Sequence, residues 1–362
     1  MNHHDESVIN EILSRQNKVL IYGNMSYAID SMHFLRNHGI EVDSFVVDVW
    51  VNKLADNIEG IPVKSIDVLI PYIEDYDVVI GFQNLEKCRA MLGLQKWLRT
   101  NVFMLWEPIA HVQWKHDWYL SHVDDFAMVR SCLVDEISKK TLDALIEARE
   151  NGHIDALMKL AMPDQYFNFL TYEKESSEEV FLDCGAFNGD TILAYNQFTA
   201  GIFKKIIAFE PELVNATKIK DNIGDIHDIL IIPKGLWGKE TVLHFTSDSS
   251  ASRVEENGAS FVEVTSIDSV MNGERVSFIK MDIEGSEYEA LLGAEKTIKK
   301  WMPKLAICVY HKCDDIFKFI AFLDEFKNEE CKYVFYLRHH TCTAYETVLY
   351  AIPQIENCKK RT

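Results

Sequence analysis

The chain has 362 residues, of which 48% are hydrophobic, and its 56 acidic side chains outnumber the 37 basic ones to give a formal net charge of −19. This length predicts two domains more readily than one. The acidic balance argues against a nucleic acid partner, which needs a basic footprint, and favours a small-molecule or glycan acceptor. Its apolar runs are only strand-sized, so we expect no membrane span, and no signal peptide opens the chain.

The first 100 residues alternate helix and strand, which predicts a small Rossmann-like domain. We expect helices over 7–16 and 27–39 and strands over 18–23, 40–48 and 76–82. Gly23 follows the first strand and Asp48 ends the second, as in a nicotinamide-binding domain, but Met25 stands where the second glycine of that fingerprint belongs. Binding of a nucleotide or sugar nucleotide to this domain is left open.

Residues 101–178 are expected to form a mostly helical connector rich in aromatic residues, with tryptophans at 106, 114 and 118 and an amphipathic helix over 138–151. Such a connector can cap the following domain or form the face of a homodimer, but core packing is the favoured explanation of its aromatic residues. The acidic run over 173–179 indicates a solvated linker. The main domain boundary is therefore placed before residues 179–362.

The last domain repeats the alternation of strand and helix, which predicts an α/β sheet of the class I, Rossmann-like kind. The expected strands are 180–184, 205–210, 229–233, 241–247, 260–268, 276–282 and 304–310, and the expected helices are 190–198, 213–222, 286–301 and 314–327. Two further strands, within 332–340 and 346–352, are expected to close the sheet as an antiparallel edge.

A glycine-containing loop after the strand 180–184 is the strongest functional signal in the chain. Glycines there let the backbone approach a ligand, and Glu210, at the end of the next strand, can accept both hydroxyls of a ribose. The acidic residues of the loop would repel a pyrophosphate but suit the cationic end of S-adenosylmethionine, which is therefore the expected cofactor. The candidate cofactor-binding residues are Asp183, Gly185, Ala186, Phe187, Asn188, Gly189, Asp190, Glu210 and Pro211.

The candidate catalytic residues lie at the ends of two later strands, because ligands gather outside the carboxyl ends of parallel strands. Asp282 and Glu284 follow one strand, although Glu284 can equally cap the next helix, and His311 with Lys312 follows the other. An imidazole with an ordinary pKa near 6.5 is well placed to act as a general base.

Metal binding is an alternative interpretation of Asp282, Glu284 and His311. Eight cysteines occur without regular spacing and without a C-x-x-C pair, which indicates reduced thiols, a cytoplasmic protein and no structural zinc. Cys308 is expected to point away from His311, and no metal ligand is assigned, although a divalent ion held by Asp282 and Glu284 is left open. The polar loop over 248–258 is expected to be either a lid over the acceptor or the turn of a hairpin.

Several segments together resemble the FkbM-type methyltransferases. They are DCGAFNGDT (183–191), AFEP (208–211), FIKMDIEGSEYEALLGAEKTI (278–298) and the closing RHH…ETVLYA, and the likeness spans about residues 130–352. The resemblance implies a seven-stranded class I fold, S-adenosylmethionine and transfer to a hydroxyl, often on a sugar or polyketide. By position it carries the cofactor role to Asp183, Gly185, Gly189 and Glu210, and it adds Lys280 to Asp282, Glu284 and His311 as candidate catalytic residues.

The expected function is therefore an S-adenosylmethionine-dependent O-methyltransferase that acts on a sugar hydroxyl of a glycan or a sugar-containing precursor. Two alternatives remain at this point. One is a nicotinamide-dependent oxidoreductase that uses the first domain, and the other is a non-catalytic binding protein on a methyltransferase fold.

Overall fold

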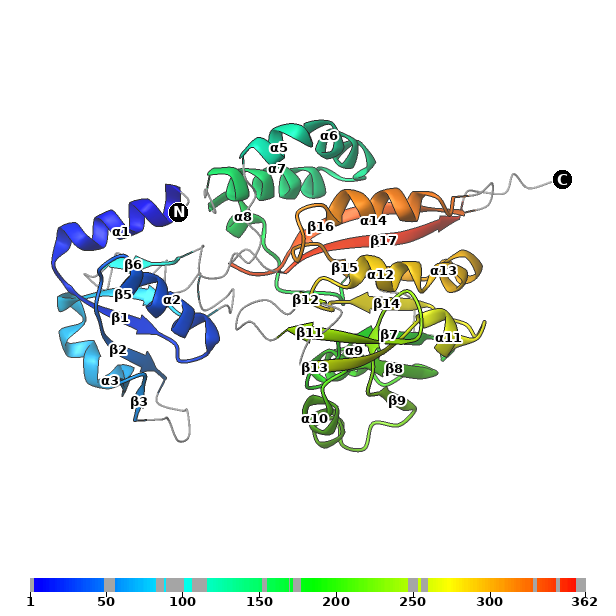
Figure 1. Cartoon of the computed structure of the whole chain (residues 1–362), viewed down its shortest axis with the longest axis horizontal. Helices are drawn as coiled ribbons and strands as arrows, with labels where there is room; N and C mark the ends of the chain where they lie inside the picture. The colour runs from blue at the N-terminus through cyan, green and yellow to red at the C-terminus, as the bar shows by residue number, and fades with distance from the viewer. Residues whose placement is uncertain are drawn as a thin grey trace. The chain divides into compact units, whose positions relative to one another are not determined.

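A computed structural model describes residues 3–48, 56–82, 88, 101–105, 116–151, 155–168, 170–171, 177–246, 253–254, 260–327, 331–342 and 346–355. The chain divides into two compact units (Figure 1). The first unit takes in residues 1–123, 137–163 and 338–347, and the second takes in 124–136, 164–337 and 348–362.

The first unit is built on a six-stranded sheet in the order β3-β4-β2-β1-β5-β6, which is parallel except for the short hairpin of β3 and β4. Its strands are β1 (Lys18–Tyr22), β2 (Val42–Val47), β3 (Asn57–Ile58), β4 (Ile61–Ser65), β5 (Tyr76–Ile80) and β6 (Asn101–Phe103). Its helices are α1 (His3–Arg15), α2 (Ser26–Asn37), α3 (Ile66–Leu69), the 3-10 helix η1 (Ile70–Asp75), α5 (His116–Ser121), α7 (Glu136–Asn151) and α8 (Asp155–Leu160). The expected alternation of helix and strand is confirmed. Strands β3 and β6 are too short to leave a hydrophobic period in the sequence, and β4, which reads IPVKS, contains a proline that argues against a strand.

A buried apolar cluster joins helices α1 and α2 to the sheet of the first unit. It includes Ile12 from α1, Met32 and Leu35 from α2, and Ile21 and Phe45 from the strands. Helix α2 ends at Asn37, two residues before the expected end, because Gly39 adopts a left-handed conformation with φ of 77°.

The second unit contains a seven-stranded sheet in the order β16-β17-β15-β14-β7-β8-β9. Its strands are β7 (Val180–Cys184), β8 (Lys205–Phe209), β9 (Ile229–Ile232), β14 (Phe278–Met281), β15 (Lys304–Cys308), β16 (Cys331–His339) and β17 (Thr347–Ile355). The five strands from β15 to β9 are parallel, and β17 runs antiparallel to β15. The expected α/β class and the antiparallel edge are therefore confirmed.

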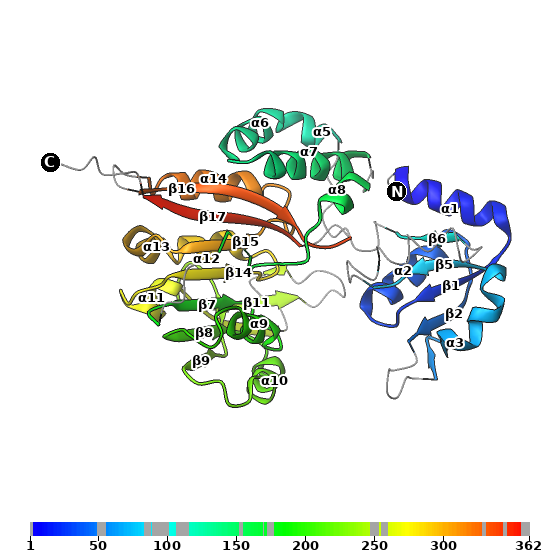
Figure 2. The same cartoon turned by 180° about the vertical axis from the view of Figure 1, so that it is seen from behind.

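Helices cover both faces of this sheet. Figures 1 and 2, which view the chain from opposite sides, show α12 (Glu287–Leu292), α13 (Glu295–Trp301) and α14 (Asp315–Asp324) over one face and α9 (Asp190–Phe198) over the other. The unit also contains α6 (Val123–Cys132) and α10 (Leu213–Ile223). Residues 101–178, expected as one connector, are thus divided between the two units.

An aromatic cluster fixes α9 against the strand that carries the glycine loop. The ring of Phe181 stacks on Tyr195 of α9 at 4.3 Å between centroids and lies 5.2 Å from Phe278 of β14. All three side chains are almost completely buried. Burial of this area holds the start of α9, and with it the loop, in one position.

A small sheet in the order β10-β13-β11-β12 lies in the chain between β9 and β14. Its strands are β10 (Gly235–Leu236), β11 (Thr241–Thr246), β12 (Arg253–Val254) and β13 (Ser260–Thr265). The sequence predicted a strand up to residue 268, but the chain turns into the helix α11 (Ile267–Met271). Apart from Arg253 and Val254, the proposed lid over 248–258 lies outside the described residues.

The helix expected over 286–301 is interrupted at Gly293. A side chain there would place its Cβ 2.3 Å from the carbonyl oxygen of Trp237, and the carbonyl of Gly293 accepts a hydrogen bond of 2.8 Å from the amide of Asp268. The carboxylate of Asp268 in turn accepts hydrogen bonds from the amides of Lys296 and Thr297. The carboxylate of Asp268 thus satisfies two amides in the first turn of α13, which begins anew at Glu295 after the interruption.

Candidate active site

The loop between β7 and α9 turns sharply beneath the end of β14. Gly185 and Gly189 have φ of 85° and 88°, and a Cβ on Gly185 would lie 1.9 Å from the carbonyl oxygen of Asp282. The amides of Gly185 and Ala186 both donate to the carbonyl of Phe209, at 3.1 Å each. Only glycine fits at position 185, so the backbone of this loop is presented without a side chain.

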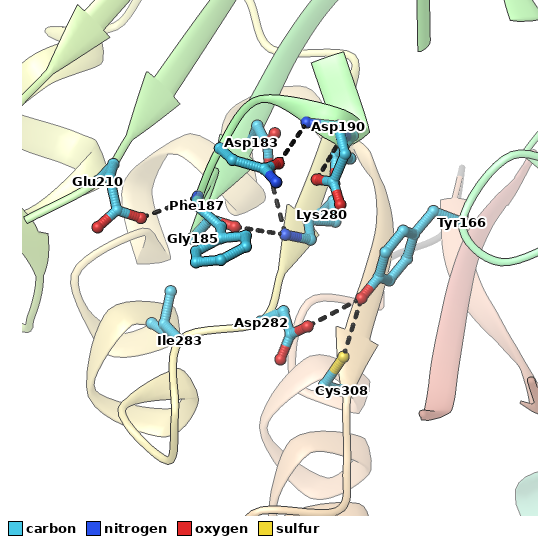
Figure 3. A network of polar contacts seen from close by, with 12 residues as sticks. Tyr166, Asp183, Gly185, Phe187, Asp190, Glu210, Lys280, Asp282, Ile283 and Cys308 are labelled. Atoms are coloured by element: carbon cyan, nitrogen blue, oxygen red, sulfur yellow. Dashed lines mark hydrogen bonds and ion pairs between the residues drawn. The ribbon is translucent and has the colours of Figure 1, made fainter. Parts of the chain in front are cut away.

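Glu210 ties the loop to the end of β8. Its Oε2 accepts a hydrogen bond of 2.8 Å from the amide of Phe187 (Figure 3), and its Oε1 accepts one of 3.0 Å from the amide of Glu212. Burial raises the pKa of Glu210, and the two amide bonds oppose that shift. The side-chain amide of Asn222 in α10 donates a hydrogen bond of 2.9 Å to the backbone carbonyl of Asn188 in the loop.

The remaining members of the predicted cofactor set lie in the same loop or beside Glu210. Asp190 begins α9 and accepts a hydrogen bond of 2.7 Å from the amide of Thr191, while its own amide donates to Asn188 at 3.1 Å. Pro211 directly follows Glu210 and is exposed. The structure therefore brings the nine predicted cofactor residues together at the ends of β7 and β8.

A buried ion pair lies under the loop. The amine of Lys280 is 3.1 Å from Oδ1 of Asp183 and donates a hydrogen bond of 2.7 Å to the carbonyl of Gly185 (Figure 3). Burial raises the pKa of Asp183 to about 6, although Lys280 pulls it down. Burial alone would lower the pKa of Lys280, but the carboxylates of Asp183 and Asp282 outweigh it and raise the value. Lys280 thus supports the loop from below.

Asp282 is held by two tyrosines at the end of β14. Its Oδ2 accepts a hydrogen bond of 3.0 Å from Tyr166, and its Oδ1 accepts one of 2.9 Å from Tyr310 (Figure 3 shows the first). Burial would raise the pKa of Asp282, but Lys280, His311 and the two hydroxyl donors keep it below its usual value. The carboxylate is therefore ionised and fixed in orientation.

His311 lies among carboxylates just beyond β15. Its Nδ1 is 2.9 Å from Oε1 of Glu287, and its Nε2 is 3.6 Å from Asp282 and 3.5 Å from Glu284. Burial would lower the pKa of this imidazole, but Glu287 first, and then Asp282 and Glu284, raise it to about 9. The ordinary value near 6.5, on which its expected role as a general base depended, does not apply in this environment.

Glu284 does not cap the following helix. It adopts a left-handed conformation with φ of 56°, and its side chain is 91% exposed. Ser286 occupies the N-cap position of α12, and the amide of Ile283 donates a hydrogen bond of 2.8 Å to Glu287 instead. The amide of Lys312, which was grouped with His311, donates to Asp315 at 2.8 Å.

The structure adds three residues that the sequence did not single out: Tyr166, Glu287 and Tyr310. Tyr166 precedes Asp282 by more than one hundred positions, so no local pattern could reveal their contact. Glu287 could have been suspected, because acidic residues are common in the first turn of a helix. The hydroxyl of Tyr166 also contacts the thiol of Cys308 at 3.4 Å. The side chain of Cys308 therefore points toward the hydroxyl that binds Asp282.

The adjacent histidines His339 and His340 make other contacts. His339 lies 2.9 Å from the hydroxyl of Thr347, and His340 lies 2.8 Å from the carbonyl oxygen of Met162. Within the described ranges, neither histidine belongs to a cluster of three possible metal ligands, whereas Asp282, Glu287 and His311 do form one.

Gly23 and Asp48, the two residues of the first unit that match a nicotinamide-binding fingerprint, have structural roles. A Cβ on Gly23 would lie 2.2 Å from the carbonyl oxygen of Gly81, so close packing of two loops requires this glycine. The carboxylate of Asp48 accepts a hydrogen bond from the hydroxyl of Tyr22. Met25, in place of the second fingerprint glycine, is 73% exposed.

Comparisons with known proteins agree with this geometry. Residues 183–335 match the model of the methyltransferase FkbM domain. No curated protein sequence matches the chain. A crystal structure of a methyltransferase FkbM from Methylobacillus flagellatus KT is similar, with 21% identity and a TM-score of 0.66 over 97% of this chain and 94% of that chain. Because that likeness spans both units, it extends beyond the matched domain and shows a shared fold.

Other solved methyltransferases resemble about half of the chain. An rRNA methylase from Streptococcus thermophilus has 18% identity and a TM-score of 0.33, over 50% of this chain and 89% of its own. A precorrin-6y C5,15-methyltransferase from Geobacter metallireducens GS-15 has 12% identity and a TM-score of 0.29, over 55% of this chain and 95% of its own. Among the described helices, none has both the length and the apolar character needed to cross a membrane.

Proposed function

Since residues 183–335 form a methyltransferase domain of the FkbM family, we propose that this protein is an S-adenosylmethionine-dependent O-methyltransferase whose acceptor is a sugar hydroxyl of a glycan or sugar-containing precursor. The observation that supports the proposal most strongly is the hydrogen bond between the carboxylate of Glu210 and the amide of Phe187 in the glycine loop. Two elements with nucleoside-binding chemistry meet there at the carboxyl ends of adjacent parallel strands.

The residues present fit this cofactor. Each carboxylate oxygen of Glu210 accepts one backbone amide and keeps a lone pair that can accept a ribose hydroxyl. The missing side chain at Gly185 leaves backbone next to that carboxylate. Asp183, Asp190 and Asp282 make the surroundings acidic, which favours a cationic amino acid and sulfonium over a pyrophosphate.

The amine nearest the loop is not available to a phosphate. Lys280 is almost completely buried and is engaged by Asp183 and by the carbonyl of Gly185. It therefore supports the loop and balances charge, and we assign it a positioning role.

The acceptor side is assigned to Asp282 and His311, which follow β14, the neighbour of β7, and β15, the next strand of the sheet. S-adenosylmethionine supplies an electrophilic methyl group when it is bound. Asp282, fixed by its tyrosine partners, and His311 can orient the acceptor hydroxyl by hydrogen bonds. Most of the rate enhancement is then expected from holding the hydroxyl in a reactive pose, with proton removal contributing less.

The test is transfer of a radiolabelled methyl group from S-adenosylmethionine to a panel of nucleotide sugars and oligosaccharides. Mild alkali then separates the products, because a methyl ether keeps the label and a methyl ester loses it. We expect alkali-stable labelling by the wild-type chain and none by Gly185→Ala. Labelling confined to alkali-labile products or to amines would contradict O-methylation of a sugar.

A further inference from the structure

Three side chains that can act as metal ligands lie close together beside the candidate cofactor loop. Methyl transfer from S-adenosylmethionine does not by itself require such a cluster. Asp282 follows β14, His311 follows β15, and Glu287 lies in the first turn of α12. One donor atom from each lies within 4.8 Å of the other two. They are held by the ends of two adjacent strands and by a helix that follows one of them, so their arrangement is fixed by the fold.

Three buried polar atoms of this cluster, in His311 and Glu287, have no hydrogen-bond partner among the described residues. His311 has a side chain only 8% exposed, and Glu287 has one that is fully buried. Although Nδ1 of His311 lies 2.9 Å from Oε1 of Glu287, the two groups are not aligned for a hydrogen bond. Within the described part of the chain, both ring nitrogens and Oε2 of Glu287 are buried without a hydrogen bond, which is costly for polar atoms unless a ligand meets them.

Charge around the cluster favours a cation. Asp282 and Glu287 contribute two carboxylates, and Glu284 adds an exposed third one 3.5 Å from Nε2 of His311. Asp282 is already oriented by Tyr166 and Tyr310, as carboxylate ligands of metals are by their surroundings. A divalent ion would balance negative charge that a single imidazole does not.

We propose that Asp282, Glu287 and one ring nitrogen of His311 bind a divalent cation of the Mn²⁺ class. Donors about 2.1 Å from an octahedral ion lie about 3 Å apart when adjacent and about 4 Å apart when opposite. One ring nitrogen of His311 and one oxygen from each of the two carboxylates all lie within 4.8 Å of one another, so small movements of these side chains would close them into such a ligand shell. Two oxygens and one nitrogen suit Mn²⁺ better than ions that prefer sulfur, and the thiol of Cys308 lies against Tyr166 instead.

The site also suggests a role that rests on the proposed function. An ion there would lie next to the residues assigned to the acceptor, where it can bind the hydroxyl oxygen and lower the pKa of that hydroxyl. Neighbouring hydroxyls of a sugar offer two oxygens to such an ion. The binding site itself is independent of this role.

Titration of the full chain with Mn²⁺ alone, after treatment with a chelator and without S-adenosylmethionine, tests the proposal. Free Mn²⁺ is followed by electron paramagnetic resonance, and nitrogen ligation by the ¹⁴N modulation of the bound ion. We expect one saturable site per chain, with affinity at least about 10-fold weaker in His311→Ala and in Glu287→Gln. The ¹⁴N signal is expected to disappear in His311→Ala.

Asp314→Asn is the matched control, because Asp314 is an acidic neighbour whose carboxylate pairs with Lys318. It should bind Mn²⁺ as the wild type does. The absence of saturable binding in the wild type, or equal affinity in wild type and both ligand variants, would overturn the proposal. If Glu287→Gln does not fold, as judged by circular dichroism, His311→Ala carries the test. A bound ion without methyl transfer would leave the site standing and count against the proposed function alone.

Discussion

The amide of Phe187 donates a 2.8 Å hydrogen bond to the carboxylate of Glu210, which joins the loop after β7 to the end of β8. The same carboxylate is expected to hold the ribose of the cofactor, so one side chain shapes the loop and contacts the ligand. This double use makes Glu210 the most sensitive position of the proposed cofactor site.

Glu210→Ala is expected to weaken binding of S-adenosylhomocysteine about 100-fold, since two charge-assisted hydrogen bonds are worth roughly 3 kcal/mol. Glu210→Gln should be intermediate, because its carbonyl can still accept from Phe187. Isothermal titration calorimetry measures both. Asp221→Asn, at an exposed position of α10, is the control and should bind normally. Unchanged affinity in Glu210→Ala would remove this residue from the cofactor site.

Gly185→Ala tests the close approach of the loop to β14. The new Cβ would lie 1.9 Å from the carbonyl oxygen of Asp282, at a backbone φ of 85°. We expect loss of cofactor binding and a lower midpoint in thermal unfolding. Gly39→Ala is the matched control, because its φ is also positive, at 77°, but no atom lies within 4 Å of its Cβ. That change should cost only about 1 kcal/mol, and equal effects of the two would show that the contact with Asp282 is unimportant.

The strands and loops that build the site could be read from the sequence, because they follow local rules. Helix α9 begins and ends at the predicted residues, since the glycine loop marks its start and the apolar spacing marks its length. The partners of Asp282 could not be read in this way. Its contact with Tyr166 depends on how distant segments pack, and the raised pKa of His311 depends on Glu287, which any helix start could carry.

Helix interruptions that are caused by tertiary contacts could not be predicted from the sequence either. Gly293 lies within a pattern that predicts a helix, yet its backbone packs against the carbonyl of Trp237 and accepts a hydrogen bond from the amide of Asp268. A single glycine costs about 1 kcal/mol in a helix, too little to end one by itself. Only the neighbours in the folded chain decide such a case.

The ion pair beneath the loop should be required for stability as a pair. Lys280→Met leaves the buried carboxylate of Asp183 without its cation, and we expect a loss of about 3–5 kcal/mol in the free energy of unfolding. Adding Asp183→Asn should recover part of this loss, because the uncompensated charge is gone. Denaturant unfolding gives both values. If the single variant does not fold, recovery of a folded double variant is itself the readout, and a double variant worse than either single one would contradict this account.

The last prediction concerns acid stability of the first unit. Burial, reinforced by the cation of Arg338, lowers the pKa of His340 to about 4 even though its ring contacts the carbonyl of Met162. The unfolded histidine has a pKa near 6.5, so between these values the unfolded chain binds a proton that the folded chain does not. Stability is therefore lost as the pH falls from about 6.5 to 4. His340 should contribute a loss of about 2 kcal/mol between pH 7 and pH 5.

His340→Gln should lack that contribution, whatever its stability at pH 7. Denaturant unfolding at both pH values measures the difference, and the comparison between pH 7 and pH 8, outside the titration range, serves as an internal control in which both proteins should change alike. An equal loss of stability in wild type and variant between pH 7 and pH 5 would show that His340 is not held neutral in the folded chain. A smaller loss in the variant would identify one buried ring as a main source of acid sensitivity, because other histidines remain in both proteins and their effects cancel in the comparison.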